Sequence, residues 1–117
     1  NGEEHEDTLT AANNYANSLV YLRRFEEAKV LLRKMIPVAR RVLGECNQTT
    51  LMTRWNYAGA ICNDTAATLD DLRDAVTTLE ETEQTARRVL GGAHPLTMDI
   101  EYDLRDGRDA LYARGLP

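Results

Sequence analysis

Few residues of this chain have the types and spacing that catalysis or metal binding requires. The sequence contains no phosphate-binding glycine loop, no zinc-binding helix motif and no nucleophile elbow. His5 and His94 are the only histidines, and no base is paired with Cys46. Cys46 and Cys62 are too few for a disulfide framework or a metal site. We therefore expect no enzymatic activity, no cofactor and no metal.

Side chains suited to binding another protein are easier to find. Asn13, Asn14 and Asn17 place two or three amides on one short segment. An Asn amide both donates and accepts hydrogen bonds, so it can hold the backbone of an extended peptide. Trp55, the only tryptophan, offers a flat anchor for an apolar or cationic side chain, and Gly59 would leave room beside it.

The charge and composition exclude several classes of partner. The net charge of −5 argues against binding to nucleic acid or to an anionic membrane. No apolar run approaches the roughly 20 residues of a membrane span. Two unpaired thiols suit a reducing compartment, so we expect a cytoplasmic protein. Aromatic residues are few, whereas Ala, Leu, Arg and Glu are common, which favours helix over sheet.

The hexapeptide ARRVLG occurs at residues 39–44 and again at 86–91, and it marks an internal repeat. A shift of 42 residues aligns the first halves of the two units, and a shift of 47 aligns their second halves. The second unit therefore carries five extra residues between Asn63 and Leu72. The aligned pairs include Thr8 with Thr50, Tyr15 with Tyr57, Ala16 with Ala58, Ala28 with Ala75, and Leu32 with Leu79.

Each unit is interpreted as a pair of helices, because apolar residues recur at spacings of three and four. We expect helices over about 6–22, 25–43, 48–63, 68–90 and 95–113. The first residue of each A helix should follow His5, Asn47 or His94, and Thr68 should cap the fourth helix. Gly44 and Gly91 should end the B helices.

The apolar stripes predict which face of each helix is buried. The first helix should bury Leu9, Ala12, Tyr15, Ala16, Leu19 and Leu22, the second Phe25, Ala28, Leu31, Leu32, Met35 and Val42, and the last Leu96, Ile100, Leu104, Gly107 and Leu111. Pro37 should kink the second helix; the alternative is that the helix ends near Met35 and restarts. Arg105 stands where the earlier units have a small alanine, which is typical of a capping helix.

These features resemble the tetratricopeptide repeat, in the 42-residue variety found in kinesin light chains. The motifs that carry the resemblance are GEEHEDTLTAANNYA, FEEAKVLL, RRVL and GGAHPLT, in register over two and a half units. The resemblance implies an all-α solenoid of five helices that winds as a right-handed superhelix. We expect one array, with repeat one over 2–43, repeat two over 44–90 and a capping helix over 91–117, as a fragment of a longer protein.

The resemblance also implies a ligand-binding groove on the concave face of the A helices. Its residues would be Thr10, Asn13, Asn17, Tyr21, Met52, Trp55, Asn56, Gly59, Asp99, Tyr102, Asp103 and Asp106. Structural roles are the alternatives at three of these positions. Trp55 would pack in the core, Asn56 (or its counterpart Asn14) would join two helices by a hydrogen bond, and Tyr102 would pack under the cap.

One kind of ligand is argued against by charge. Some tetratricopeptide domains hold the C-terminal carboxylate of chaperones with a set of Lys, Arg and Asn side chains. Asn17 and Asn56 fall on the Asn positions of that set, but Asn13, Asp99 and Asp103 occupy basic positions. A carboxylate would be repelled there, so we expect neither a chaperone-tail clamp nor an acidic kinesin-type cargo peptide.

We therefore expect a protein-interaction scaffold that prefers a neutral or basic peptide or helix. A structural spacer that self-associates through exposed repeat ends is one alternative. The sensor arm of a larger signalling protein is another.

Overall fold

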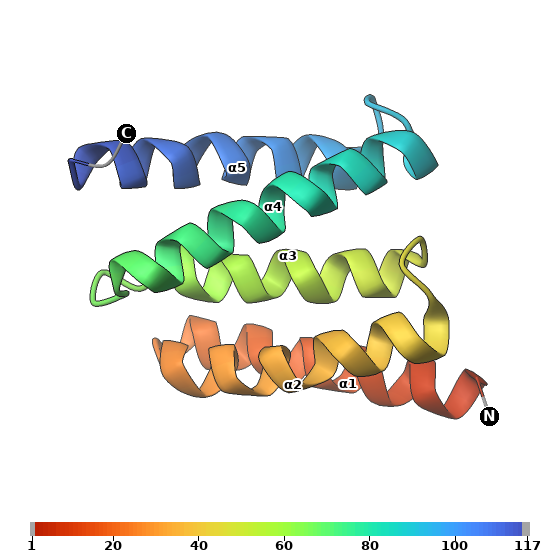
Figure 1. The fold of residues 1–117 in the computed structure, drawn as a ribbon. Coiled ribbons are helices and arrows are strands. Elements are labelled where there is room, and N and C mark those ends of the chain that lie inside the picture. Colours follow the sequence, from red (N-terminus) through yellow and green to blue (C-terminus); the bar gives the residue numbers. More distant parts are fainter. Residues whose placement is uncertain (1, 116–117) are drawn as a thin grey trace.

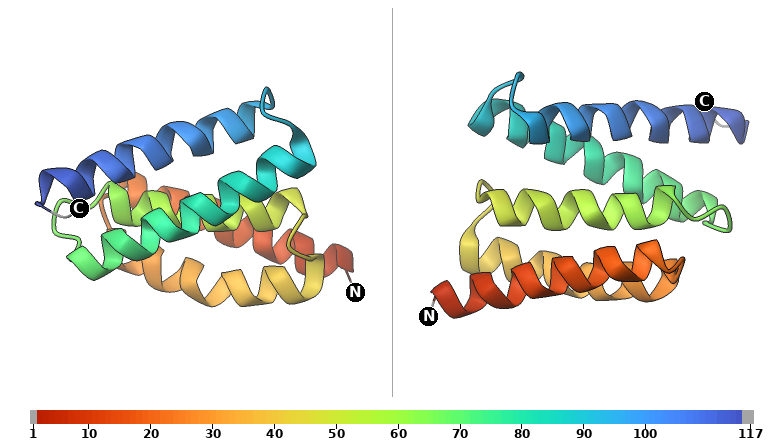
Figure 2. Two further views of the ribbon diagram at one scale, coloured as in Figure 1. Left: turned by 45° about the horizontal axis from the view of Figure 1, so that its top comes forward. Right: turned by 180° about the vertical axis from the view of Figure 1, so that it is seen from behind.

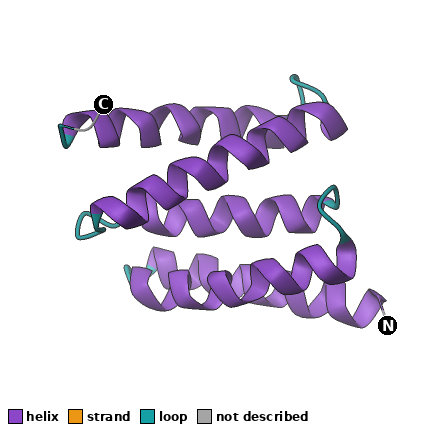
Figure 3. Ribbon diagram, viewed as in Figure 1, coloured by secondary structure: helices purple, strands orange, loops and turns teal. Residues whose placement is uncertain are grey.

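The computed structural model describes residues 2–115, with side chains from residue 6 onward. This part of the chain forms five α-helices and no strand (Figure 3). The helices are α1 (Gly2–Tyr21), α2 (Phe25–Leu43), α3 (Gln48–Cys62), α4 (Leu69–Leu90) and α5 (Pro95–Ala113). The expectation of an all-α helical-repeat fold is confirmed.

The helices are arranged as consecutive antiparallel hairpins in two layers (Figure 1). Helix α3 packs against both α1 and α5, whereas the Cα atoms of α2 and α4 stay more than 8 Å apart and only their side chains meet. Figure 2 shows from two further directions that α1, α3 and α5 run the same way and form one layer of the molecule. The A helices therefore share one continuous face, and the array extends over 46 × 31 × 21 Å.

Side-chain caps begin three of the helices where the sequence predicts them. The Asn47 side chain accepts a hydrogen bond from the Thr49 N–H at 2.8 Å, and Thr68 Oγ1 accepts one from the Asp71 N–H at 3.1 Å. The Nδ1 atom of His94 accepts from Leu96 N–H at 3.0 Å. Each cap satisfies an amide that the first helical turn leaves without a partner.

The predicted start of the first helix is wrong. Helix α1 begins at Gly2, so position 5 lies inside the helix rather than before it. The side chain of His5 lies outside the described residues. His94 does cap its helix, so the two aligned histidines do not share one local structure.

The two glycines after the B helices adopt nearly the same backbone conformation. Gly44 has φ 90° and ψ 161°, and Gly91 has φ 92° and ψ 154°. This region of backbone space is open almost only to glycine. ARRVLG therefore recurs because both B helices end in the same turn, with two arginines beside the last carbonyl groups.

Helix α2 runs without interruption from Phe25 to Leu43, with Pro37 inside it. The alternative that the helix stops near Met35 is therefore wrong. Some of the extra residues of the second unit lengthen the connection between its two helices. This connection spans residues 63–68 between α3 and α4, whereas the one between α1 and α2 spans residues 22–24. The rest lengthen α4, which begins at Leu69, before the residue that aligns with Phe25.

Alanines and leucines at aligned positions form the core between the two layers. Fully buried members include Ala16, Ala28, Leu32, Leu51, Ala58, Ala75, Leu79 and Ile100. The small alanines let paired helices approach closely, while the leucines fill the space between them. The predicted stripe of α5 is confirmed for Leu96, Ile100, Leu104 and Gly107, with Leu111 half-buried.

Two residues of the predicted stripe of α1 are exposed instead. Tyr15 is 59% exposed and Leu22 is 61% exposed, whereas Tyr57, which aligns with Tyr15, is only 3% exposed. Helix α2 covers Tyr57, but no helix of the described chain lies on the equivalent side of α1. In α2, Phe25, Leu31, Met35 and Val42 are half-buried rather than buried, because they lie at the edges of the apolar stripe.

Candidate functional site

Two adjoining hollows lie on the layer formed by α1, α3 and α5. The first has a volume of 110 Å³ and lies between α3 and α5. The second has a volume of 140 Å³ and reaches from α5 across α3 to α1. Both are lined by Gly59, Asn63 and Asp103, so they form one continuous depression, which we call the A-helix groove.

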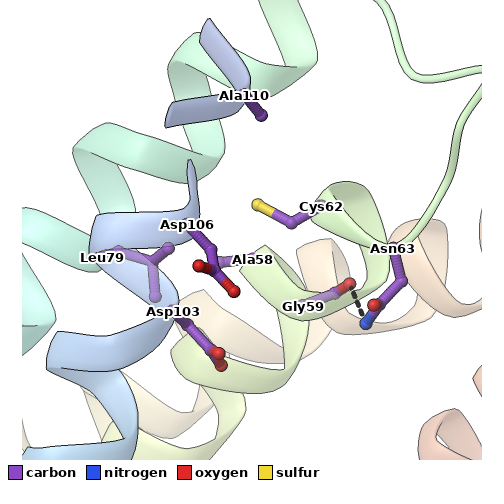
Figure 4. A pocket seen from close by; sticks show the side chains of 8 residues that line it. All are labelled: Ala58, Gly59, Cys62, Asn63, Leu79, Asp103, Asp106 and Ala110. Atoms are coloured by element: carbon purple, nitrogen blue, oxygen red, sulfur yellow. Dashed lines mark hydrogen bonds between the residues drawn. The ribbon is translucent and has the colours of Figure 1, made fainter. Parts of the chain in front are cut away.

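The first hollow has a floor of small side chains and an acidic rim (Figure 4). Ala58, Gly59 and Ala110 contribute almost no side-chain volume. A Cβ atom added at Gly59 would meet only Asn63 Nδ2, at 4.0 Å, so the space beside Gly59 is open. The carboxylates of Asp103 and Asp106 lie on the α5 side of the same hollow.

Trp55 is half-buried and connects two helices across the groove. Its indole N–H donates to Asp103 Oδ2 at 2.6 Å, which joins α3 to α5. The side chain packs partly against the core and also lines the second hollow. Trp55 is thus both a packing residue and a wall of the groove.

Three of the four aspartates of α5 carry negative charge that no basic side chain of the described residues balances. Within the described residues, no Lys or Arg forms an ion pair with Asp99, Asp103 or Asp106. Burial raises the pKa of Asp103, the hydrogen bond from Trp55 opposes that rise, and the charges of Asp106 and Asp99 add to it. The groove is therefore anionic on its α5 side.

Asn13 does not lie free in the groove as predicted, because it is 5% exposed. Its Nδ2 donates to Thr53 Oγ1 at 3.0 Å, and its Oδ1 accepts from Asn56 Nδ2 at 3.2 Å. The Asn13 amide thus joins α1 to α3. Asn56 makes the inter-helix hydrogen bond that was the alternative to a role in ligand binding. This polar contact sits beneath the groove and fixes the two helices that carry it.

The structure brings together only part of the predicted groove. Asn17, Trp55, Asn56, Gly59, Asp103 and Asp106 line the two hollows. Thr10, Tyr21, Asp99 and Tyr102 are exposed on the A helices but do not line either hollow, and half-buried Met52 packs against the core. Tyr102 is 63% exposed, so it does not pack under the cap.

Sequence reasoning missed Cys62, Asn63, Val20 and Ala110, which also line the hollows. Helical spacing could have found all four, since Val20 follows the predicted Asn17 by about one turn. Cys62 and Asn63 follow Gly59 by about one turn, and Ala110 follows Asp106 by one turn. Burial, with the nearby charges of Asp103 and Asp106, raises the pKa of the Cys62 thiol to about 11.

Comparison with known proteins agrees with this architecture. Residues 8–45 match the model of the tetratricopeptide repeat family, a span that covers most of α1, all of α2 and the glycine turn. Residues 8–45 therefore form a tetratricopeptide-type repeat, and α3 and α4 repeat the matched hairpin. A search of curated proteins and a search of solved structures each gave no match.

Repeats of this family generally mediate interactions between proteins, and they are typically scaffolds rather than enzymes. Among the described helices, none is long and apolar enough to cross a membrane. The described residues also contain no group of three or more His, Cys, Asp or Glu side chains placed to hold a metal ion.

Proposed function

We propose that the A-helix groove binds a peptide or helix of another protein, and that the ligand is neutral or basic. The unbalanced carboxylates of α5, within a depression that also presents Asn amides and an indole, are the observation that carries this proposal. An acidic segment would be repelled, whereas a basic one would gain Coulomb attraction in a partly desolvated site. We propose neither nucleic acid nor an anionic membrane as a ligand, because the same carboxylates would repel their phosphate groups, and we propose the cytoplasm as the place of the interaction.

The amide groups supply the remaining part of the recognition. Asn17 is exposed beside the second hollow, and Asn63 lies at the point where the hollows meet. Such amides can bind a peptide backbone without regard to its side chains. A chaperone-type carboxylate clamp is not proposed, because Asp99 and Asp103 occupy positions where that clamp needs cations.

The test is a titration with pooled acidic, neutral and basic peptides, monitored by the fluorescence of Trp55. We expect the basic or neutral pool to change the emission, because Trp55 lines the groove and is bonded to Asp103. Amide chemical shifts, assigned residue by residue, give the location independently. Ligand-induced shifts confined to α2 and α4 would contradict the proposal, as would the absence of any response.

Self-association is a second candidate function, favoured by the exposed tyrosine of α1. Tyr15 aligns with Tyr57, which is covered by Arg33 of the preceding hairpin. A second array that stacked on α1 and α2 would cover Tyr15 in the same way. Analytical ultracentrifugation over a wide concentration range tests this, with Tyr15→Glu expected to reduce association. A monomer at every concentration would exclude it.

A further inference from the structure

We propose that the first hollow of the A-helix groove is a pocket for one lysine or arginine side chain of the bound peptide. This inference rests on the proposed function, since it concerns the same groove. It goes further in assigning the charge preference to one pocket, with Asp103 and Asp106 as the residues that determine it.

The shape of the pocket suits a long, slender side chain. Ala58, Gly59, Leu79, Cys62 and Ala110 give it an apolar lining, and the space beside Gly59 is open. Lysine and arginine bury their aliphatic stems against such surfaces while the charged group stays at a polar edge. Here that edge is formed by the two carboxylates of α5 (Figure 4).

The negative charges of the pocket favour a cation that the described part of the chain does not supply. Elsewhere partly buried acidic groups have partners: Asp71 is paired with Lys29 at 2.9 Å, and Glu83 with Arg87 at 2.8 Å. Asp103 is also half-buried, but among the described residues its side-chain partner is the neutral indole of Trp55 alone. A ligand cation would offset the mutual repulsion of Asp103 and Asp106 and the cost of burying Asp103.

The geometry favours a side chain of a peptide over a free small cation. The acidic pocket continues into the second hollow, where Asn17, Asn56 and Trp55 lie within reach of adjacent ligand groups. The Trp55 indole uses only Oδ2 of Asp103, which leaves Oδ1 for the ligand. A peptide that placed its basic residue in the first hollow would lay its backbone across the second.

The experiment is a selection of random twelve-residue peptides on the folded chain, followed by affinity measurements on the selected peptides. We expect one position of the aligned peptides to be enriched in Lys or Arg. Replacing that residue by norleucine should weaken binding about tenfold to the unmodified chain. The same replacement should have almost no effect on a chain carrying Asp103→Asn and Asp106→Asn, because the coupling resides in these carboxylates.

Controls separate the pocket from general electrostatics. Asp70→Asn removes an exposed carboxylate on α4 that lines neither hollow, and should leave the norleucine effect unchanged. Gly59→Leu should block the pocket and reduce the norleucine effect, with helical content checked by circular dichroism. Gly59→Ala adds only one methyl group and should reduce the norleucine effect less than Gly59→Leu does.

The possible failures are distinguishable. Selected peptides that shift the groove amides but carry no basic residue would overturn this inference and leave the proposed function standing. If no peptide binds the groove, both are overturned. Full displacement of the peptides by free spermidine at equal concentration would identify a small-cation site and overturn the assignment to a peptide side chain.

Discussion

Tyr57 joins three helices through one hydroxyl group and one ring. Arg33 of α2 donates to the hydroxyl oxygen at 2.7 Å, and its guanidinium lies 5.5 Å from the ring centroid. The same hydroxyl donates to Asp74 of α4. Burial and the Asp74 hydrogen bond raise the pKa of Tyr57, so the hydroxyl keeps its proton and remains a donor.

We expect Tyr57→Phe to lower the free energy of unfolding by about 1 kcal/mol, because the hydroxyl's hydrogen bonds with Arg33 and Asp74 are lost while the ring and its contacts remain. Urea denaturation followed by circular dichroism measures this. Tyr15→Phe is the matched control at the aligned position. Since Tyr15 is exposed, its change should stay within about 0.5 kcal/mol, and an equal loss in both variants would contradict the assignment.

The two thiols should differ strongly in reactivity. Cys62 has a pKa of about 11, whereas Cys46 is exposed in the turn before α3. Only the thiolate reacts with iodoacetamide, and at pH 8 about one Cys62 thiol in a thousand would be ionised. We expect Cys46→Ser to resist alkylation at pH 8 and to react faster as the pH rises toward 11. The control Cys62→Ser, which keeps Cys46, should be alkylated rapidly at pH 8 by mass spectrometry.

At the scale of the helix, the ends of the elements depend on a few local devices. Three helices start with a side-chain N-cap, from Asn47, Thr68 or His94. Helices α2 and α4 end at a glycine, Gly44 or Gly91. These devices use only near neighbours in the sequence. For that reason, the bounds of α2 and α5 could be predicted to the residue, and those of α3 and α4 to within one residue.

Gly91→Ala should destabilise the fold by about 1–3 kcal/mol, because φ near +90° is strained for any residue with a Cβ atom. No atom lies within 4 Å of that added Cβ, so the cost comes from the backbone alone. The comparison is Gly59→Ala inside α3, where the better helix former should stabilise by about 0.5–1 kcal/mol. Thermal unfolding measures both, and a neutral Gly91→Ala would show that the turn relaxes.

Contacts between distant residues were much less predictable than the helices. The stripe of α1 includes Tyr15, but periodicity cannot show whether another helix lies against that side. The tetratricopeptide resemblance predicts Asn13 in the groove, but its amide is buried by hydrogen bonds with Thr53 and Asn56. The bond from Trp55 to Asp103 lies at the repeat positions of the Asn13–Asn56 bond, since Trp55 aligns with Asn13 and Asp103 with Asn56. The side chains differ in type at both positions, so the repeat pattern alone does not predict that they bond.

At the scale of the whole molecule, α3 is the central element. It packs against α1, α2, α4 and α5, whereas α1 and α5 do not contact each other within the described chain. In an array of this kind, stability is the sum of terms between neighbouring elements. The outer helices therefore have fewer stabilising contacts than the centre.

Native-state amide hydrogen exchange should reveal this gradient. We expect the slowest exchange in the middle of α3, where opening requires loss of contacts on all sides, and faster exchange in α1 and α5. Nuclear magnetic resonance resolves the individual amides. Uniform protection across the five helices would show instead that the array opens only as one unit.

The ion pairs at the two junctions between units have opposite polarity. Lys29 of α2 meets Asp71 of α4 at 2.9 Å, so the first helix B presents a cation to the next hairpin. At the following junction Glu80 of α4 meets Arg108 of α5 at 3.0 Å, so the second helix B presents an anion. In the repeat alignment, Glu80 occupies the position of Arg33.

The charges at the two junctions therefore favour the natural order of the units. If residues 44–90 were followed by a second copy of themselves, Glu80 would replace Arg33 opposite Tyr57, Asp71 and Asp74, and repulsion would replace attraction. Such a tandem should unfold at a lower urea concentration than the natural order. A lineage that lengthened this array by copying a unit would therefore have to change charges on both sides of the new junction, which makes each unit specific to its neighbours.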